Sequence, residues 1–141
     1  MKQILIYFTA IVLTTSCHGN LIKPTYNKGG YTFNKFYNKS LYNNESAIIY
    51  GHLRELGSSK VVLSARLNMA CASLLVDSTG YYQFNGKVGD EVTFLTCISL
   101  GLRTIETEPF KVQRGDSINV NFFLAQDDRP LVNCEGNIIK Q

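Results

Sequence analysis

Apolar and polar residues alternate most regularly in the last long hydrophobic segment, residues 117–124, whose sequence is SINVNFFL. Every second side chain of an extended chain points to the same side, so this segment predicts a strand with one apolar face. Shorter apolar runs precede it, separated by clusters of Gly, Asp, Ser and Asn. The expected strands are 47–53, 60–67, 73–76, 81–84, 91–98, 102–107, 110–112 and 117–124. Roughly seven short strands joined by turns, without a convincing helix, predict an all-β domain folded as a seven-stranded antiparallel sandwich.

Two of the turns contain residues that suit tight backbone bends. The segment 77–80, Asp-Ser-Thr-Gly, separates two apolar runs, which is a signal for a β-hairpin. In this turn we expect Asp77 to accept hydrogen bonds from the backbone and Gly80 to adopt a positive φ at little cost. Gly89 and Asp90 mark the next turn. All four residues are predicted to have structural roles.

Residues 1–16 have the pattern of an export signal. A lysine precedes an apolar run over 4–13, which has the size of a signal-peptide core and is shorter than the about 20 residues that a helix needs to cross a bilayer. Small residues then lead to Cys17, which resembles the lipobox of bacterial lipoproteins, although Thr14 replaces the usual aliphatic residue. The resemblance implies that Cys17 is acylated and anchors the exported protein in the bacterial cell envelope. The alternative is an ordinary secretory signal cut nearer Gly19.

Charge divides the remaining chain into parts. Residues 17–44 are rich in Asn, Lys and Tyr. They are basic because they contain no acidic residue; the first one in the protein is Glu45. They show neither sustained alternation nor a helical period, although their aromatic residues fit a short strand at 31–37. We therefore expect a flexible tether that holds a domain over 45–126 away from the membrane, followed by a tail over 127–141.

Four features of this domain resemble the carboxypeptidase regulatory-like domains, which have a transthyretin-like β-sandwich. The features are IYG at 49–51, the small residue Ala65 in the second strand, DSTGYY at 77–82, and GDEVTF at 89–94 followed by SLG at 99–101. Similar domains occur in envelope proteins of Bacteroidetes, which agrees with the lipoprotein-like leader. Because the regulatory domain of that family is not its catalytic domain, the resemblance implies no peptidase activity.

One pair of residues has the spacing of two zinc ligands in carboxypeptidases, His52 and Glu55. A catalytic zinc ion needs three protein ligands, and the other histidine, His18, lies in the expected tether. Residues three apart in a strand also point to opposite faces. We therefore expect no catalytic residue, no metal site and no cofactor, with a small secreted hydrolase that uses His52 and Glu55 as the alternative.

The cysteines other than Cys17 are three in number, which leaves one unpaired if a disulfide forms. Export to an oxidising compartment favours a disulfide. We expect Cys97 to pair with Cys134, which would attach the tail to the domain and add about 3–4 kcal/mol of stability in the chain-entropy model. A Cys71–Cys97 disulfide and three reduced thiols are the other possibilities.

Composition narrows the range of functions. A chain of 141 residues holds one domain of ordinary size, and its net charge of +3 is too small to indicate a nucleic-acid-binding protein. The expected function is a non-catalytic envelope lipoprotein that presents a binding or scaffolding module. Its candidate contact surfaces are the loops 55–60 and 98–103, because loops on rigid scaffolds carry function. The expected partners are the membrane, through the anchor, and an envelope protein or a glycan. A structural surface protein that self-associates through sheet edges is an alternative.

Overall fold

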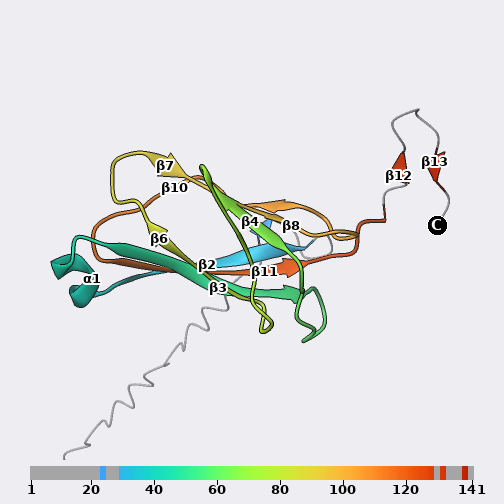
Figure 1. The fold of residues 1–141 in the computed structure, drawn as a ribbon, viewed down its shortest axis with the longest axis horizontal. Coiled ribbons are helices and arrows are strands. Elements are labelled where there is room, and N and C mark those ends of the chain that lie inside the picture. Colours follow the sequence, from blue (N-terminus) through green and yellow to red (C-terminus); the bar gives the residue numbers. More distant parts are fainter. Residues whose placement is uncertain (1–22, 25–28, 129–130, 133–137, 140–141) are drawn as a thin grey trace, which may run out of the picture.

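Two long strands, each of which buries every second residue, form the centre of the fold. The structure is a computed structural model that describes residues 23–24, 29–128, 131–132 and 138–139. β3 (Ala47–Glu55) and β11 (Asp116–Leu124) run side by side in parallel, whereas the other strand pairs in the described part of the chain are antiparallel (Figure 1). The alternating segment 117–124 therefore lies in β11, a strand with neighbours on both of its sides.

The strands form two main sheets. A five-stranded sheet has the order β1-β2-β11-β3-β6, and a four-stranded sheet has the order β5-β4-β8-β9. The bounds of the five-stranded sheet are β1 (Lys23–Pro24), β2 (Gly30–Tyr37) and β6 (Tyr81–Gly86), with β3 and β11 as above. Those of the four-stranded sheet are β4 (Arg66–Met69), β5 (Ala72–Leu75), β8 (Leu95–Ile98) and β9 (Ile105–Glu106). The remaining elements are α1 (Lys39–Asn43), the pair β7 (Val92–Thr93) and β10 (Phe110–Lys111), and the pair β12 (Leu131–Val132) and β13 (Ile138–Ile139). The all-β class expected from the sequence is confirmed.

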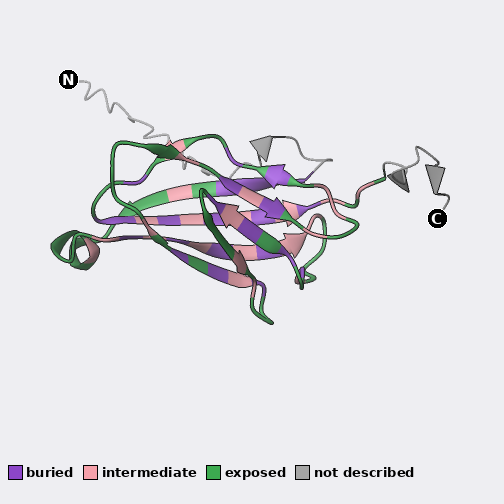
Figure 2. Cartoon of the chain, turned by 45° about the horizontal axis from the view of Figure 1, so that its top comes forward, coloured by how far each residue is buried: buried purple, intermediate pink, exposed green. Residues whose placement is uncertain are grey.

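One hydrophobic core receives side chains from both main sheets. Buried residues alternate with half-buried or exposed ones along the long strands (Figure 2). Its fully buried members include Ile49 and Phe122 from the five-stranded sheet and Leu67 and Leu95 from the four-stranded sheet. Each fully buried aliphatic or aromatic side chain contributes about 1.5–3 kcal/mol relative to an exposed one. The outer faces of the sheets carry polar and half-buried residues together with a few exposed apolar side chains, namely Phe36, Leu75 and Ile98.

A glycine allows β3 and β11 to approach closely in the middle of the core. A Cβ atom on Gly51 would lie 1.8 Å from the backbone oxygen of Val120, so only glycine fits. The hydroxyl of Tyr82, the β6 residue that pairs with Gly51, donates a hydrogen bond to this same Val120 oxygen at 2.7 Å. The next residue, His52, donates its backbone N–H to the side-chain oxygen of Asn121 at 3.0 Å. Side chains thus supply hydrogen bonds to both strands where the pairing between β3 and β11 is interrupted, between Tyr50 and Leu53.

The expectation of a flexible tether over 17–44 is wrong for residues 30–44. β2 pairs with β11 from Gly30 to Tyr37, and Tyr31 packs against Phe122 with its ring buried. α1 follows directly, capped by the Asn38 side chain, which accepts hydrogen bonds from two backbone N–H groups. Residues 17–22 and 25–28 lie outside the described residues.

Arg114, in the turn before β11, attaches α1 to the domain. Its guanidinium donates to the backbone oxygen of Tyr42 at 2.7 Å and to the Glu45 carboxylate at 2.8 Å, and it also lies 4.6 Å from the centre of the Tyr42 ring. The Asn38 N–H donates to the backbone oxygen of Gly115 at 2.7 Å. The segment between β2 and β3 is therefore part of the folded domain.

Several of the expected strands and turns differ from the structure; the expected strand 102–107, for example, is reduced to β9 at Ile105–Glu106. The expected strand 60–67 is irregular until Arg66, because Ser64 has a φ of 60° and interrupts an extended chain. The expected strand 91–98 divides at Phe94 into β7 and β8, which pair with different strands. The turn 77–80 does not close a hairpin, since β5 and β6 on its two sides belong to different sheets.

Candidate binding pocket

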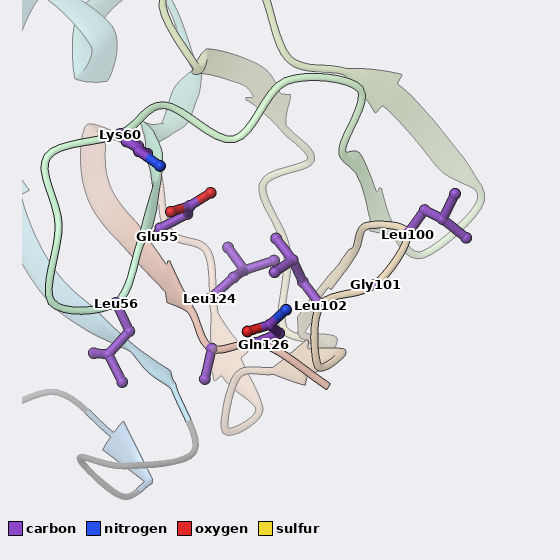
Figure 3. Close-up of a pocket in the computed structure, with 9 residues that line it drawn as sticks. Glu55, Leu56, Lys60, Leu100, Gly101, Leu102, Leu124 and Gln126 are labelled. Atoms are coloured by element: carbon purple, nitrogen blue, oxygen red, sulfur yellow. The ribbon is translucent and has the colours of Figure 1, made fainter. Parts of the chain in front are cut away.

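A pocket opens at one end of the domain, where the two loops singled out from the sequence meet. Its volume is about 590 Å³, within the usual range for small-molecule sites. The first loop contributes Glu55, Leu56 and Lys60, the second Leu100, Gly101 and Leu102, and the segment after β11 completes the lining with Leu124, Ala125 and Gln126 (Figure 3). The sequence had indicated the two loops, but it gave no sign that the end of β11 lies between them.

The first loop is fixed to β11 by backbone hydrogen bonds. The Glu55 N–H donates to the oxygen of Lys60 at 2.9 Å, which closes the loop on itself. The Leu56 N–H donates to the oxygen of Leu124 at 2.8 Å. Gly57 has a φ of 74°, in the left-handed region that other residues rarely adopt, and this lets the chain turn back. Hydrogen bonds within the loop 55–60, and from the loop to β11, therefore hold this wall of the pocket in place.

The second loop is fixed to the segment that follows β11. The Arg103 N–H donates to the oxygen of Ala125 at 2.9 Å, and the Asp127 N–H donates to the oxygen of Gly101 at 3.0 Å. An ion pair joins the side chains of Arg103 and Asp128, and the hydrogen bond from Arg103 holds the pKa of the Asp128 carboxyl below its usual value. The two loops therefore approach each other because each is attached to the end of β11.

The pocket combines an apolar surface with two oppositely charged groups. Leu102 and Leu124 lie at the centre of the lining, with Glu55 and Lys60 on one side and Leu100 on the other (Figure 3). Leu100 is 99% exposed, so its whole side chain is offered to solvent. Among these nine residues only Glu55 and Lys60 carry a charge, and none is a histidine, a cysteine, a serine or a threonine. This chemistry suits binding by apolar contact and ion pairing.

The structure separates His52 from Glu55, the pair with zinc-ligand spacing. His52 lies on the outer face of β3 with its ring centre 5.3 Å from that of Tyr81, whereas Glu55 lines the pocket. In residues 23–24, 29–128, 131–132 and 138–139, no group of three or more His, Cys, Asp or Glu side chains is placed to hold a metal ion.

The thiol of Cys97 is free and fully buried between the sheets. Burial raises its pKa to about 12. The alternative disulfide between Cys97 and Cys71 is not formed. The expected disulfide between Cys97 and Cys134 stays a prediction, because Cys134 is not among the residues that the structure describes. Cys71 is exposed in the turn between β4 and β5, and its thiol is also free. Cys17 and Cys134 lie outside the described residues.

Asp77 organises the turn that leads from one main sheet to the other. One of its carboxylate oxygens accepts hydrogen bonds from the Thr79 hydroxyl at 2.6 Å, the Thr79 N–H at 2.8 Å and the Tyr81 N–H at 2.9 Å. The bond from the Thr79 hydroxyl is the main reason that the pKa of Asp77 is lowered. Gly80 has a φ of 74°, and its oxygen accepts from the Leu53 N–H at 2.9 Å.

The second predicted turn, at Gly89 and Asp90, lies in the exposed connection between β6 and β7. The Gly89 N–H donates to the oxygen of Val112 at 3.2 Å. Both turns lie away from the pocket lining, and we assign them no part in binding.

Comparison with known proteins leaves the chain without an assigned family. No family model matches it, and no curated protein matches it either. Within the described residues, no helix has the length and apolar character needed to cross a membrane.

Proposed function

We propose that this protein is a non-catalytic binding module of the bacterial cell envelope, anchored through an acylated Cys17. The observation that carries the proposal is that the loops 55–60 and 98–103 come together around one pocket that is lined by leucines and a pair of opposite charges. The lining contains no serine, threonine, cysteine or histidine, so it offers none of the usual nucleophile–histidine pairs. In this proposal the domain is a transthyretin-like sandwich of the carboxypeptidase regulatory-like type.

The pocket favours a protein segment as its ligand. Exposed Leu100 and half-buried Leu102 can cover an apolar side chain, while Lys60 and Glu55 can pair with charges beside it. Protein interfaces concentrate their binding energy in a few such anchors. We therefore expect a short segment of a neighbouring envelope protein, with one apolar anchor next to charged residues, to occupy the pocket.

Affinity capture from solubilised envelopes tests this function. The wild-type protein should retain a defined partner, and Leu100→Asp should lose it, because a carboxylate replaces a fully exposed apolar contact. Leu75→Asp is the matched control, since Leu75 is 63% exposed on β5 and outside the pocket lining. Capture of the same proteins by wild type and Leu100→Asp would contradict the proposal.

The anchor is tested separately. Detergent-extracted protein should have the mass of a chain that begins at Cys17 and carries acyl groups, and Cys17→Ser should release the protein from the membrane fraction. Cys71→Ser, which removes an exposed thiol elsewhere, should leave it membrane-bound. An unmodified mass for the wild type would show that Cys17 is not acylated.

A further inference from the structure

The outer face of the five-stranded sheet presents amide and aromatic side chains with very little charge. Pairing across the strands places Asn34, Asn119, Tyr50 and Gln83 in one continuous row, from β2 through β11 and β3 to β6. The neighbouring row contains Asn121 and Tyr81. We call these six residues the amide face. All six are half-buried or exposed, and they alternate along their strands with residues that point into the core.

Hydrogen bonds fix the orientation of the central amides. The Asn121 side chain accepts from the His52 N–H at 3.0 Å and donates to the side-chain oxygen of Asn119 at 2.9 Å. The hydroxyl of Tyr81 donates to the side-chain oxygen of Gln83 at 2.8 Å. The Asn121 amide also donates to the Thr32 hydroxyl at 3.5 Å, and the Asn119 amide donates to the backbone oxygen of Tyr50 at 3.4 Å. Each amide has two donor hydrogens and two acceptor lone pairs, so Asn119 keeps one donor and Gln83 keeps both of its donors for a ligand. A fixed set of polar groups loses little conformational entropy when it binds.

The distribution of charge indicates which ligand fits. The protein has 25 charged residues, 14 basic and 11 acidic, yet Arg54 is the one charged residue that β2, β3, β6 and β11 place on this side of the sheet. A nucleic acid or an anionic lipid surface needs a concentration of Lys and Arg. A protein partner is usually bound through an apolar centre, and here the centre of the surface consists of amides. The neutral face is complementary to a neutral ligand that both donates and accepts hydrogen bonds.

We propose that the amide face binds a neutral polysaccharide chain. Sugar hydroxyls are both donors and acceptors, which matches the amides of Asn34, Gln83 and Asn119. The half-exposed rings of Tyr50 and Tyr81 offer apolar surfaces to the C–H groups of a sugar, with polar hydroxyl groups at their tips. Four strands about 4.8 Å apart make each row about 14 Å long, enough to contact several linked sugars. This surface lies on a different part of the domain from the pocket and acts independently of it.

Affinity electrophoresis of the detergent-extracted full-length protein tests the proposal. The gels contain neutral polysaccharides, namely soluble starch, a mixed-linkage β-glucan, galactomannan and xylan, and polygalacturonate serves as an acidic counterpart. We expect at least one neutral polysaccharide to slow migration, and polygalacturonate to have no effect. Gln83→Ala and Asn34→Ala remove exposed or half-exposed amides and should each weaken the interaction about fivefold to tenfold. Tyr81→Ala should weaken it by at least as much, because it removes both a ring and the contact that orients Gln83.

Leu100→Asp is the control that separates this surface from the pocket, and it should leave the retardation unchanged. A urea midpoint close to that of the wild type confirms that the Gln83→Ala and Asn34→Ala variants are folded. Three results would each overturn the proposal: no retardation by the whole neutral panel, retardation by polygalacturonate alone, or equal retardation of the wild type and all three face variants. Light scattering that shows a second copy of the chain covering this face, with dimers lost in Gln83→Ala, would also overturn it.

Discussion

Replacing Gly51 by alanine tests the close approach of β3 and β11. The added Cβ would lie 1.8 Å from the Val120 oxygen and 2.6 Å from the Val120 carbonyl carbon, both of them backbone atoms. Real Cβ contacts essentially never fall below 3.0 Å, so the strands must separate locally by about 1.2 Å. Strands in a sheet are normally about 4.8 Å apart. A shift of this size disrupts the hydrogen bonds on both sides of Gly51.

The expected loss of stability has two parts. Overpacking in a filled core costs typically about 1–3 kcal/mol. The hydrogen bond from Tyr82 to Val120, 2.7 Å long in a buried site, contributes about 0.5–1.5 kcal/mol more. We therefore expect Gly51→Ala to lower the free energy of unfolding by about 2–4 kcal/mol, a large fraction of the 5–15 kcal/mol typical of a domain.

Urea denaturation followed by circular dichroism measures this loss. Gly89→Ala is the matched control, because nothing lies within 4 Å of a Cβ at Gly89 and its φ is in the ordinary region. The control should be neutral or slightly stabilising. Tyr82→Phe removes the same hydrogen bond by deleting its donor. The loss of unfolding free energy in the double variant should therefore be smaller than the sum of the losses in Gly51→Ala and Tyr82→Phe. A loss below about 1 kcal/mol relative to Gly89→Ala would refute the reasoning, since it would mean that the backbone yields without cost.

Three further predictions concern the thiols and the turn between the sheets. Iodoacetamide should modify Cys71 in the native protein and Cys97 only after unfolding, because Cys71 is exposed and Cys97 is buried. If Cys97 stayed unmodified in urea without reductant, it would be part of a disulfide. The pKa of the folded Cys97 thiol is raised from an ordinary value of 9.0 to about 12, so its contribution to stability is complete below pH 9 and declines between about pH 9 and pH 12, by about 1.4 kcal/mol per pH unit. Denaturation at a series of pH values should show this decline in the wild type and a shallower one in Cys97→Ala; equal slopes would contradict it. Asp77→Ala should lower the urea midpoint more than Asp77→Asn, which keeps an acceptor oxygen for Thr79 and Tyr81, and equal midpoints would show that these hydrogen bonds do not stabilise the turn.

Regular alternation made the two central strands predictable, but the sequence did not reveal their neighbours. β3 and β11 contain glycine or apolar residues at their inward positions except at the strand ends, and burial of that face follows directly from the period of two. Their parallel pairing joins residues far apart in the chain, and no local pattern specifies such a partner. The same limit explains the turn 77–80, whose residues indicate a bend but not the sheets that its two strands enter.

β2 was assigned to the tether, although its aromatic residues fitted a short strand, because a lysine interrupts the alternation of its inward positions Tyr31, Phe33, Lys35 and Tyr37. Lys35 occupies one of them, and its ammonium group pairs with the buried Asp116 carboxylate at 2.7 Å. The charge that breaks the alternation in the sequence is thus neutralised by a residue of the neighbouring strand. The pocket was predictable only in part. Its two loops could be recognised as connections between expected strands, whereas Leu124 and Gln126 line the pocket only because the fold places the end of β11 between the loops.

The position of β11 has a consequence for the order in which the protein can fold as it is synthesised. β2 and β3 are separated in the sheet by β11, the last long strand to be synthesised, so neither can complete its pairing until residues 116–124 have been made. Contacts between distant parts of a chain slow folding and require most of the chain to be present. The five-stranded sheet therefore cannot assemble before its last long strand has been made, whereas the four-stranded sheet contains no part of β11 and pairs only strands between Arg66 and Glu106. Truncation before Asp116 should therefore yield a chain without the protease resistance of the whole domain, and that resistance should appear only once Leu124 is included.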